Sequence, residues 1–280
     1  MIRLLAIDID GTLLDSRGRI PDAHRQALGE ASARGTTVAL VTGRSFHFTR
    51  PVAEALQIPV TMIVNNGAMV KGADGTTLVR RLLPREAALA VLAGTPAFED
   101  SVAVVFERDD ERQIVFERMD WTHPHRSGYY EKNKAFIAAA SPLAAAITED
   151  PVQVMFTGGV ARMRALAAEL RAMPIADRFS VALTEYESRD FSLVDVNDAG
   201  CSKGSTLARW AAAGGFAPAD VMAVGDNLND LEMLEFAGTA VVMGNAADAV
   251  KRARSFHVTG TNDEGGLADA IRRFVLVDGR

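Results

Sequence analysis

The chain has 280 residues, of which 48% are hydrophobic and 24% are charged. At about 150 residues per domain, this length predicts one large domain or two smaller ones, with enough apolar residues for a buried core. Its 36 acidic residues outnumber its 30 lysines and arginines, which gives a formal net charge of -6. Because duplex-binding proteins usually carry a basic surplus, this charge argues against a nucleic acid as the main partner.

The first third of the chain alternates short apolar runs with longer amphipathic ones. Strands are expected over 2–7, 37–41 and 61–64, and helices over 21–34 and 46–56. The alternation of strand and helix predicts a parallel sheet covered by helices on both faces.

This alternation of strand and helix ends near residue 82. From there to residue 188, longer strands accompany helical runs, which indicates a separate α+β unit inserted in the chain. Strands are expected over 102–107, 113–117, 152–157 and 180–185, a helix over 160–173, and a charged turn over 109–112.

Alternation returns after residue 188. Strands are expected over 191–196, 221–224 and 239–242, and helices over 202–213, 229–237 and 266–274. We therefore predict an α/β fold with a discontinuous parallel-sheet core, 1–81 and 189–280, interrupted by an α+β unit, 82–188.

Neither an oxidising compartment nor a membrane is indicated by the sequence. Its one cysteine, Cys201, cannot form an internal disulfide. The apolar run before Asp8 is too short for a signal peptide, and no run approaches the roughly 18 apolar residues of a spanning helix. We therefore expect a cytoplasmic protein with no membrane partner.

Two aspartates follow the first predicted strand, in the run Asp8-Ile9-Asp10-Gly11-Thr12. Two residues apart, they project in similar directions at the edge where open α/β sheets bind ligands. Neighbouring carboxylates do not both ionise cheaply without a cation, and Mg²⁺ takes oxygen ligands. A strand end with solvated acids is the simpler alternative. An EF-hand loop fits poorly, because its glycine falls at the sixth position rather than the fourth.

Two further segments offer donors to an anion. In the run Val41-Thr42-Gly43-Arg44-Ser45, Thr42 and Gly43 lie between a predicted strand and a predicted helix, where a hydroxyl, an open amide and a helix N-terminus favour anions. Lys203 falls in the first turn of a helix that Ser202 can cap, although a cation there opposes the helix dipole. A local rule broken in this way points to function. A capped turn and a solvated lysine are the alternatives.

The fourth segment, Gly225-Asp226-Asn227-Leu228-Asn229-Asp230, follows the predicted strand 221–224. At a strand end, Asp226 can meet Asp8 and Asp10. Asn229 and Asp230 open the next helix, a favourable place for acceptors, and a simple N-cap box is the alternative. Any one of the four segments could occur by chance, but chance is a much poorer explanation for all four in one chain.

In order, these four segments resemble the motifs of the haloacid dehalogenase-like (HAD) superfamily of phosphohydrolases. The insert resembles the large α+β cap of that superfamily. Asn65-Asn66-Gly67-Ala68 and Leu231-Glu232-Met233-Leu234 are similar to its Cof-like phosphatase branch. The resemblance covers the whole chain, and it implies a Rossmann-like core with a cap that selects the substrate.

The resemblance also implies a mechanism. Asp8 would be the nucleophile that forms an aspartyl-phosphate, and Asp10 the general acid and base. Lys203 and Mg²⁺ would neutralise charge between phosphate and nucleophile. The implied Mg²⁺ ligands are Asp8, the Asp10 carbonyl and Asp226, with Asp230 supporting. The implied phosphate-binding residues are Thr42, Gly43 and Asn229.

The expected substrates are small phosphomonoesters, either sugar phosphates or phosphorylated cofactors such as pyridoxal phosphate. A phosphomutase and specialised sugar-phosphate or mannosyl-phosphoglycerate-type phosphatases share the motifs and stay open. A non-enzymatic nucleotide-binding module is disfavoured, since the sequence has neither a P-loop nor a G-x-G-x-x-G run. His123 and His125 lack a third metal ligand at matching spacing, so we expect a surface loop over 121–126.

Overall fold

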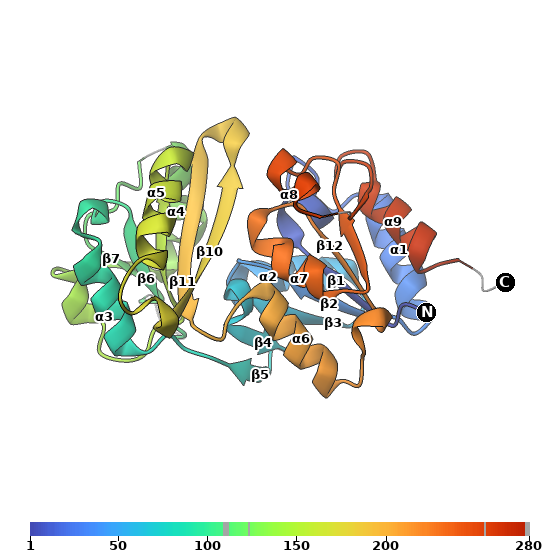
Figure 1. Cartoon of the computed structure of the whole chain (residues 1–280), viewed down its shortest axis with the longest axis horizontal. Coiled ribbons are helices and arrows are strands. Elements are labelled where there is room, and N and C mark those ends of the chain that lie inside the picture. Colours follow the sequence, from blue (N-terminus) through green and yellow to red (C-terminus); the bar gives the residue numbers. More distant parts are fainter. Residues whose placement is uncertain (109–111, 123, 255, 278–280) are drawn as a thin grey trace. The chain divides into compact units, whose positions relative to one another are not determined.

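The computed structural model describes residues 1–108, 112–122, 124–254 and 256–277. The chain divides into two units (Figure 1). The first unit combines Met1–Arg80 with Ser202–Arg280, and the second is Arg81–Cys201. Residues 109–111 of the predicted charged turn, and His123, lie outside the described residues.

The first unit is built on an eight-stranded sheet with the order β14-β13-β12-β1-β2-β3-β4-β5. The strands from β14 to β3 pair in parallel, which confirms the predicted α/β class. A hairpin that the sequence reasoning missed, β4 and β5, adds two antiparallel strands at one edge. The strands are β1 (Leu4–Ile7), β2 (Thr37–Val41), β3 (Val60–Val64), β4 (Met69–Lys71), β5 (Thr77–Arg80), β12 (Val221–Gly225), β13 (Thr239–Val242) and β14 (His257–Val258).

Helices cover this sheet because its central strand is apolar on both faces. Leu4 and Ala6 of β1 pack with Leu207 of α6 and Met233 of α7 in one buried cluster. Side chains alternate along a strand, so Leu5 faces the other side, and it too is fully buried. The helices of this unit are α1 (Asp22–Ala33), α2 (Phe46–Leu56), α6 (Lys203–Ala213), α7 (Leu231–Phe236), α8 (Asp248–Ala253) and α9 (Gly266–Phe274).

The second unit has its own six-stranded sheet, with the order β10-β11-β9-β6-β7-β8. Its strand pairs are antiparallel except for β7 and β8. The strands are β6 (Val102–Val105), β7 (Ile114–Phe116), β8 (Ile137–Ala139), β9 (Gln153–Gly158), β10 (Phe179–Tyr186) and β11 (Phe191–Asp198). The helices are α3 (Arg85–Gly94), α4 (Pro124–Asn133) and α5 (Val160–Arg171), and a buried cluster joins α3 and α5 to the sheet.

The boundary expected at residues 188 and 189 differs from the one in the structure. The strand predicted over 191–196 was expected in the first sheet, but it is β11, which pairs with β10 from Phe191 to Asp198. A four-residue connection with Asp190 in the left-handed region makes the two strands a hairpin. The second segment of the first unit therefore begins at Ser202 and not at residue 189. Residues 121–126, expected as a loop, include the start of α4.

Across the described part of the chain, every helix falls short of the length and apolar character that crossing a membrane requires.

Replacement of Phe156 tests the core of the second unit. Phe156 is fully buried and packs edge-on against Phe98, with 6.5 Å between ring centroids. Phe156→Ala leaves a cavity, so we expect the free energy of unfolding to fall by about 3–5 kcal/mol in urea titrations followed by circular dichroism. Leu78→Ala, at a side chain 53% exposed, is the control and should change it by less than about 0.5 kcal/mol. Equal urea midpoints for both variants would contradict this description of the core.

Candidate active site

Three adjacent strands deliver the predicted site residues to one edge of the first sheet. Strand β1 lies between β2 and β12, with Ile7 in register with Leu40 and Val224. Because the strands are parallel, their carboxyl ends meet at the same edge. Asp8, Thr42 and Asp226 are the residues that directly follow these strands.

The chain leaves β1 through a tight turn, Ile9–Leu13, that passes beside Asp226. Gly11 has a φ of 81°, and a Cβ atom there would lie 2.3 Å from Asp226 Oδ2. Only glycine fits this approach without displacing the carboxylate. Thr12 Oγ1 donates a hydrogen bond of 2.8 Å to Asp226 Oδ1, which fixes the carboxylate from the same turn.

Asp8, Asp226 and Asp230 form a buried carboxylate cluster around Lys203. Each offers a carboxylate oxygen within 4.8 Å of the others. Lys203 Nζ donates to Asp8 Oδ1 at 2.7 Å and to Asp230 Oδ1 at 2.6 Å. The cluster therefore carries more negative than positive charge when ionised. Its oxygen donors fit a hard divalent cation, which would supply the missing positive charge.

Burial and mutual repulsion perturb these groups strongly. Burial raises the pKa of Asp8 to about 7, and the attraction of Lys203 offsets this only in part. Burial, with repulsion from Asp8 and Asp230, also raises the pKa of Asp226 well above its ordinary value. Burial opposes the charge of Lys203, but Asp230 and Asp8 outweigh it and raise the pKa of the ammonium. Lys203 therefore stays positively charged, but its charge alone does not balance the negative charge of the ionised carboxylates around it.

Asp230 is held differently from the other two acids. Its Oδ2 accepts the backbone N–H groups of Asp226 at 3.0 Å and Asn227 at 2.9 Å, while Oδ1 accepts Lys203. Gly225 permits this arrangement, since a Cβ atom there would lie 2.7 Å from the Asp230 carboxylate. Asp230 therefore shapes the loop after β12 and orients Lys203.

The Asp10 side chain lies outside this cluster. Arg44 binds it through two hydrogen bonds, Nε to Oδ2 at 2.7 Å and Nη2 to Oδ1 at 2.6 Å. The carboxylate is 38% exposed, so it remains accessible from solvent. Of the four acids predicted around a metal, the structure gathers three by their side chains and pairs the fourth with Arg44. Our sequence reasoning gave Arg44 no role.

The predicted anion-binding residues gather around one residue to which sequence reasoning gave no role, Asn66. The backbone N–H of Asn66 donates to Thr42 O at 3.0 Å, and Asn229 Nδ2 donates to Asn66 Oδ1 at 3.0 Å. A Cβ atom on Gly43 would lie 3.2 Å from Asn66 Oδ1. Thr42 thus contacts the backbone of Asn66, whereas Gly43 and Asn229 lie against its buried side-chain amide.

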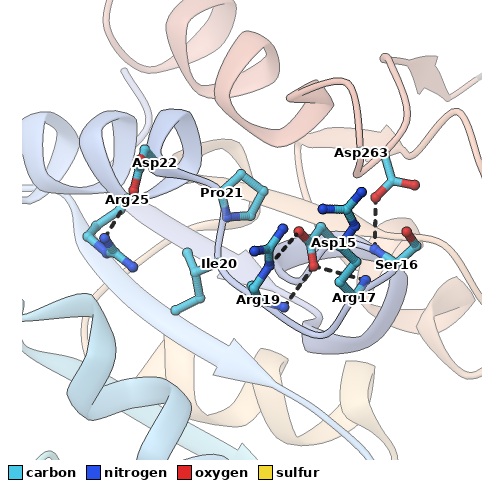
Figure 2. A pocket seen from close by; sticks show the side chains of 9 residues that line it. All are labelled: Asp15, Ser16, Arg17, Arg19, Ile20, Pro21, Asp22, Arg25 and Asp263. Carbon is cyan, nitrogen blue, oxygen red and sulfur yellow. Dashed lines mark hydrogen bonds and ion pairs between the residues drawn. The ribbon is translucent and has the colours of Figure 1, made fainter.

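A separate hollow lies in the loop that leads from the Ile9–Leu13 turn to α1 (Figure 2). The carboxylates of Asp15 and Asp263, which line it, accept hydrogen bonds from the backbone of this loop. Asp15 accepts the backbone N–H groups of Arg17 and Arg19, and Asp263 accepts that of Ser16. The hydrogen bond from the backbone N–H of Arg19 is the main cause that lowers the pKa of Asp15. None of the predicted site residues lines this hollow, so it lies outside the candidate site.

Comparisons with known proteins agree with the fold. A family model described as haloacid dehalogenase-like hydrolase matches residues 5–271. The chain is 30% identical to the pyridoxal phosphate phosphatase YbhA of Escherichia coli, over 98% of this chain and 97% of that protein. It is 29% identical to the 5-amino-6-(5-phospho-D-ribitylamino)uracil phosphatase YcsE of Bacillus subtilis, over 98% and 96% of the two chains.

Among solved structures, the chain is similar to a phosphatase of the HAD enzyme superfamily from Bacteroides thetaiotaomicron. The TM-score is 0.79 at 26% identity, and the match covers 99% of this chain and 96% of that one. The family match spans nearly the whole sequence and includes the strand ends that carry Asp8, Thr42 and Asp226. The chain belongs to the haloacid dehalogenase-like hydrolase family.

Proposed function

We propose that the protein is a Mg²⁺-dependent phosphatase that hydrolyses small phosphomonoesters through an aspartyl-phosphate on Asp8. The observation that carries the proposal is the buried carboxylate of Asp8, which Lys203 holds inside a cluster of acids at the sheet edge where Thr42 follows the neighbouring strand. Named relatives that act on pyridoxal phosphate and on a phosphoribitylamino-uracil support a phosphorylated cofactor or sugar phosphate as substrate.

The residues that would hold the cation are Asp8, the Asp10 backbone carbonyl and Asp226, with Asp230 in support. When bound, Mg²⁺ supplies positive charge that draws the phosphoryl group toward the carboxylates. Lys203 supplies further positive charge beside Asp8 Oδ1 and holds that carboxylate in one orientation. Thr42, Gly43 and Asn229 would bind the phosphoryl oxygens, which leaves the phosphorus facing Asp8.

Two displacement steps complete the reaction. An Asp8 carboxylate oxygen attacks phosphorus while the bond from phosphorus to the leaving oxygen breaks, and Asp10 gives that oxygen a proton. Asp10 then takes a proton from a water molecule, which attacks phosphorus and releases inorganic phosphate and the Asp8 carboxylate. Arg44 orients Asp10 for both transfers through its paired hydrogen bonds.

We propose the second unit, Arg81–Cys201, as the cap that selects the leaving group. It has a core of its own, so its sequence can change without disturbing the sheet that carries Asp8. Assays of inorganic phosphate release from a panel of phosphomonoesters identify the substrate class. The same assay separates hydrolysis from a phosphomutase, which returns the phosphoryl group to a sugar.

Replacement of the nucleophile is the first test. Asp8→Asn keeps the shape of the side chain but removes its charge and nucleophilicity, so Mg²⁺-dependent phosphate release should fall by at least about 10³-fold. Asp22→Asn, at a side chain 99% exposed on α1, is the matched control and should retain wild-type activity. Retained activity in Asp8→Asn would reject the proposed nucleophile.

Replacement of Asp10 separates the two steps. p-Nitrophenyl phosphate has a leaving group that departs without a proton, so its first step should survive in Asp10→Asn while hydrolysis of the intermediate slows by about 10²–10⁴-fold. Stopped-flow measurements should then show a burst of one nitrophenolate per enzyme, followed by slow turnover. A linear time course with no burst would contradict the two-step role of Asp10.

Cation binding should depend on pH because the pKa of Asp8 lies at about 7 without a metal. A carboxyl whose folded-state pKa is raised destabilises the metal-free protein as pH rises from about 4 through about 7. Mg²⁺ offsets this repulsion, and below pH 7 it must first displace protons. We expect Mg²⁺ to raise the melting temperature more at about pH 8 than at about pH 5.5. Equal shifts at both pH values in differential scanning fluorimetry would contradict this linkage.

A further inference from the structure

The turn Ile9–Leu13, which follows β1, shapes the proposed cation site at two points. It contains the Asp10 backbone carbonyl, and its Thr12 hydroxyl donates to Asp226 Oδ1 at 2.8 Å. Between these two points lies Gly11, which has no side chain that could hold the backbone. Glycine is required there, because a Cβ atom would lie 2.3 Å from the Asp226 carboxylate. The position of the turn therefore depends on contacts from other segments.

Asn245, which lies in the loop after β13, supplies one of these contacts. Its Nδ2 donates to the Gly11 carbonyl at 2.8 Å, and its Oδ1 accepts the backbone N–H of Asn262 at 3.0 Å. A carbonyl only accepts hydrogen bonds and a backbone N–H only donates them, so both contacts require the same orientation of the amide. The Asn245 amide is thus held from one side while it holds Gly11 on the other.

The loop after β14 holds the chain just beyond the turn. Asn262 is 7% exposed, and its Nδ2 donates to the Leu14 carbonyl at 2.7 Å. Gly244 packs closely on the same loop, since its N–H donates to Gly260 O at 2.9 Å and a Cβ atom on it would lie 2.9 Å from the Gly260 backbone. The loops after β13 and β14 therefore form one support for the turn.

The Gly11 carbonyl is the point at which this support reaches the site. A peptide group is planar, so a hydrogen bond to the Gly11 carbonyl also fixes the backbone nitrogen and Cα of Thr12. The Thr12 hydroxyl then reaches Asp226 from a fixed backbone. Without the bond from Asn245, the chain can rotate at glycine, whose backbone is the least restricted of all residues. Asn245 therefore influences Asp226 through Gly11 and Thr12.

We propose that Asn245 is a positioning residue of the cation site, which acts through the turn that follows β1. By holding the Gly11 carbonyl, it keeps the Thr12 hydroxyl in place to orient Asp226. The inference rests on the proposed function and adds to it a residue outside the four motifs. Because loss of Asn245 misplaces a cation ligand but removes none, it should weaken Mg²⁺ binding and leave kcat at saturating Mg²⁺ close to that of the wild type.

Asn245→Ala is the main variant, because it truncates an exposed side chain and leaves no buried cavity. Calorimetric titration with MgCl₂, without substrate, should give a Mg²⁺ Kd about 3–10-fold weaker than that of the wild type. Phosphate release should require correspondingly more Mg²⁺, while kcat at saturating Mg²⁺ stays within about 2-fold of the wild type. Gln26→Ala is the control, since Gln26 is also an exposed amide with one donated hydrogen bond, of 2.9 Å to Glu30, and it should match the wild type in both assays.

A double-mutant cycle shows whether Asn245 acts through Thr12. Thr12→Val keeps the shape of this buried side chain but removes the hydroxyl that donates to Asp226. In the Thr12→Val background, Asn245→Ala should weaken Mg²⁺ binding by less than about 2-fold, because the hydroxyl that Asn245 positions is already gone.

Three results would overturn the inference while wild-type Mg²⁺ binding and phosphatase activity stand. They are a wild-type Mg²⁺ Kd in Asn245→Ala, a loss of kcat in that variant that saturating Mg²⁺ does not restore, and effects of Asn245→Ala and Thr12→Val that multiply. A wild-type protein that neither binds Mg²⁺ nor releases phosphate would reject the proposed function and this inference with it.

Discussion

Buried carboxylates around a single ammonium group govern the arrangement of the candidate active site. Asp8, Asp226 and Asp230 are buried around Lys203. When all three carboxylates are ionised, the single ammonium group does not balance their negative charge. An isolated buried charge is costly, and removal of Lys203 would leave the acids uncompensated. The same imbalance makes the cluster receptive to a divalent cation, and through that cation to an anionic phosphate.

The sheet makes this concentration of charge achievable. Parallel strands bring residues far apart in sequence to one edge, and the close contacts there depend on residues without a side chain. Gly11 lets the chain pass beside Asp226, and Gly225 leaves room for the Asp230 carboxylate. Backbone N–H groups hold Asp230, and the hydroxyl of Thr12 holds Asp226. Rigid positioning of charge before substrate arrives is the property that favours catalysis of phosphoryl transfer.

The sequence predicts the parts of this site that follow from strand periodicity. Asp8 and Asp226 follow apolar runs, so their meeting at one edge follows from a parallel sheet, and Lys203 stands out because it opposes a helix dipole. Long-range side-chain geometry was beyond that reasoning. The pairing of Arg44 with Asp10 and the central place of Asn66 depend on contacts between distant segments, although the Asn-Asn-Gly run is itself a turn signal. The expected boundary at residue 188 was wrong for a related reason, since periodicity does not reveal which sheet β11 joins.

Direct identification of the phosphorylated side chain tests the central claim. Enzyme with Asp10→Asn, quenched in acid during turnover with p-nitrophenyl phosphate and Mg²⁺, should carry an acyl-phosphate that hydroxylamine converts to a hydroxamate. Peptide mass spectrometry should locate that hydroxamate on Asp8 and on no other residue. A phosphoryl group on another side chain, or active enzyme that never carries one, would contradict the account.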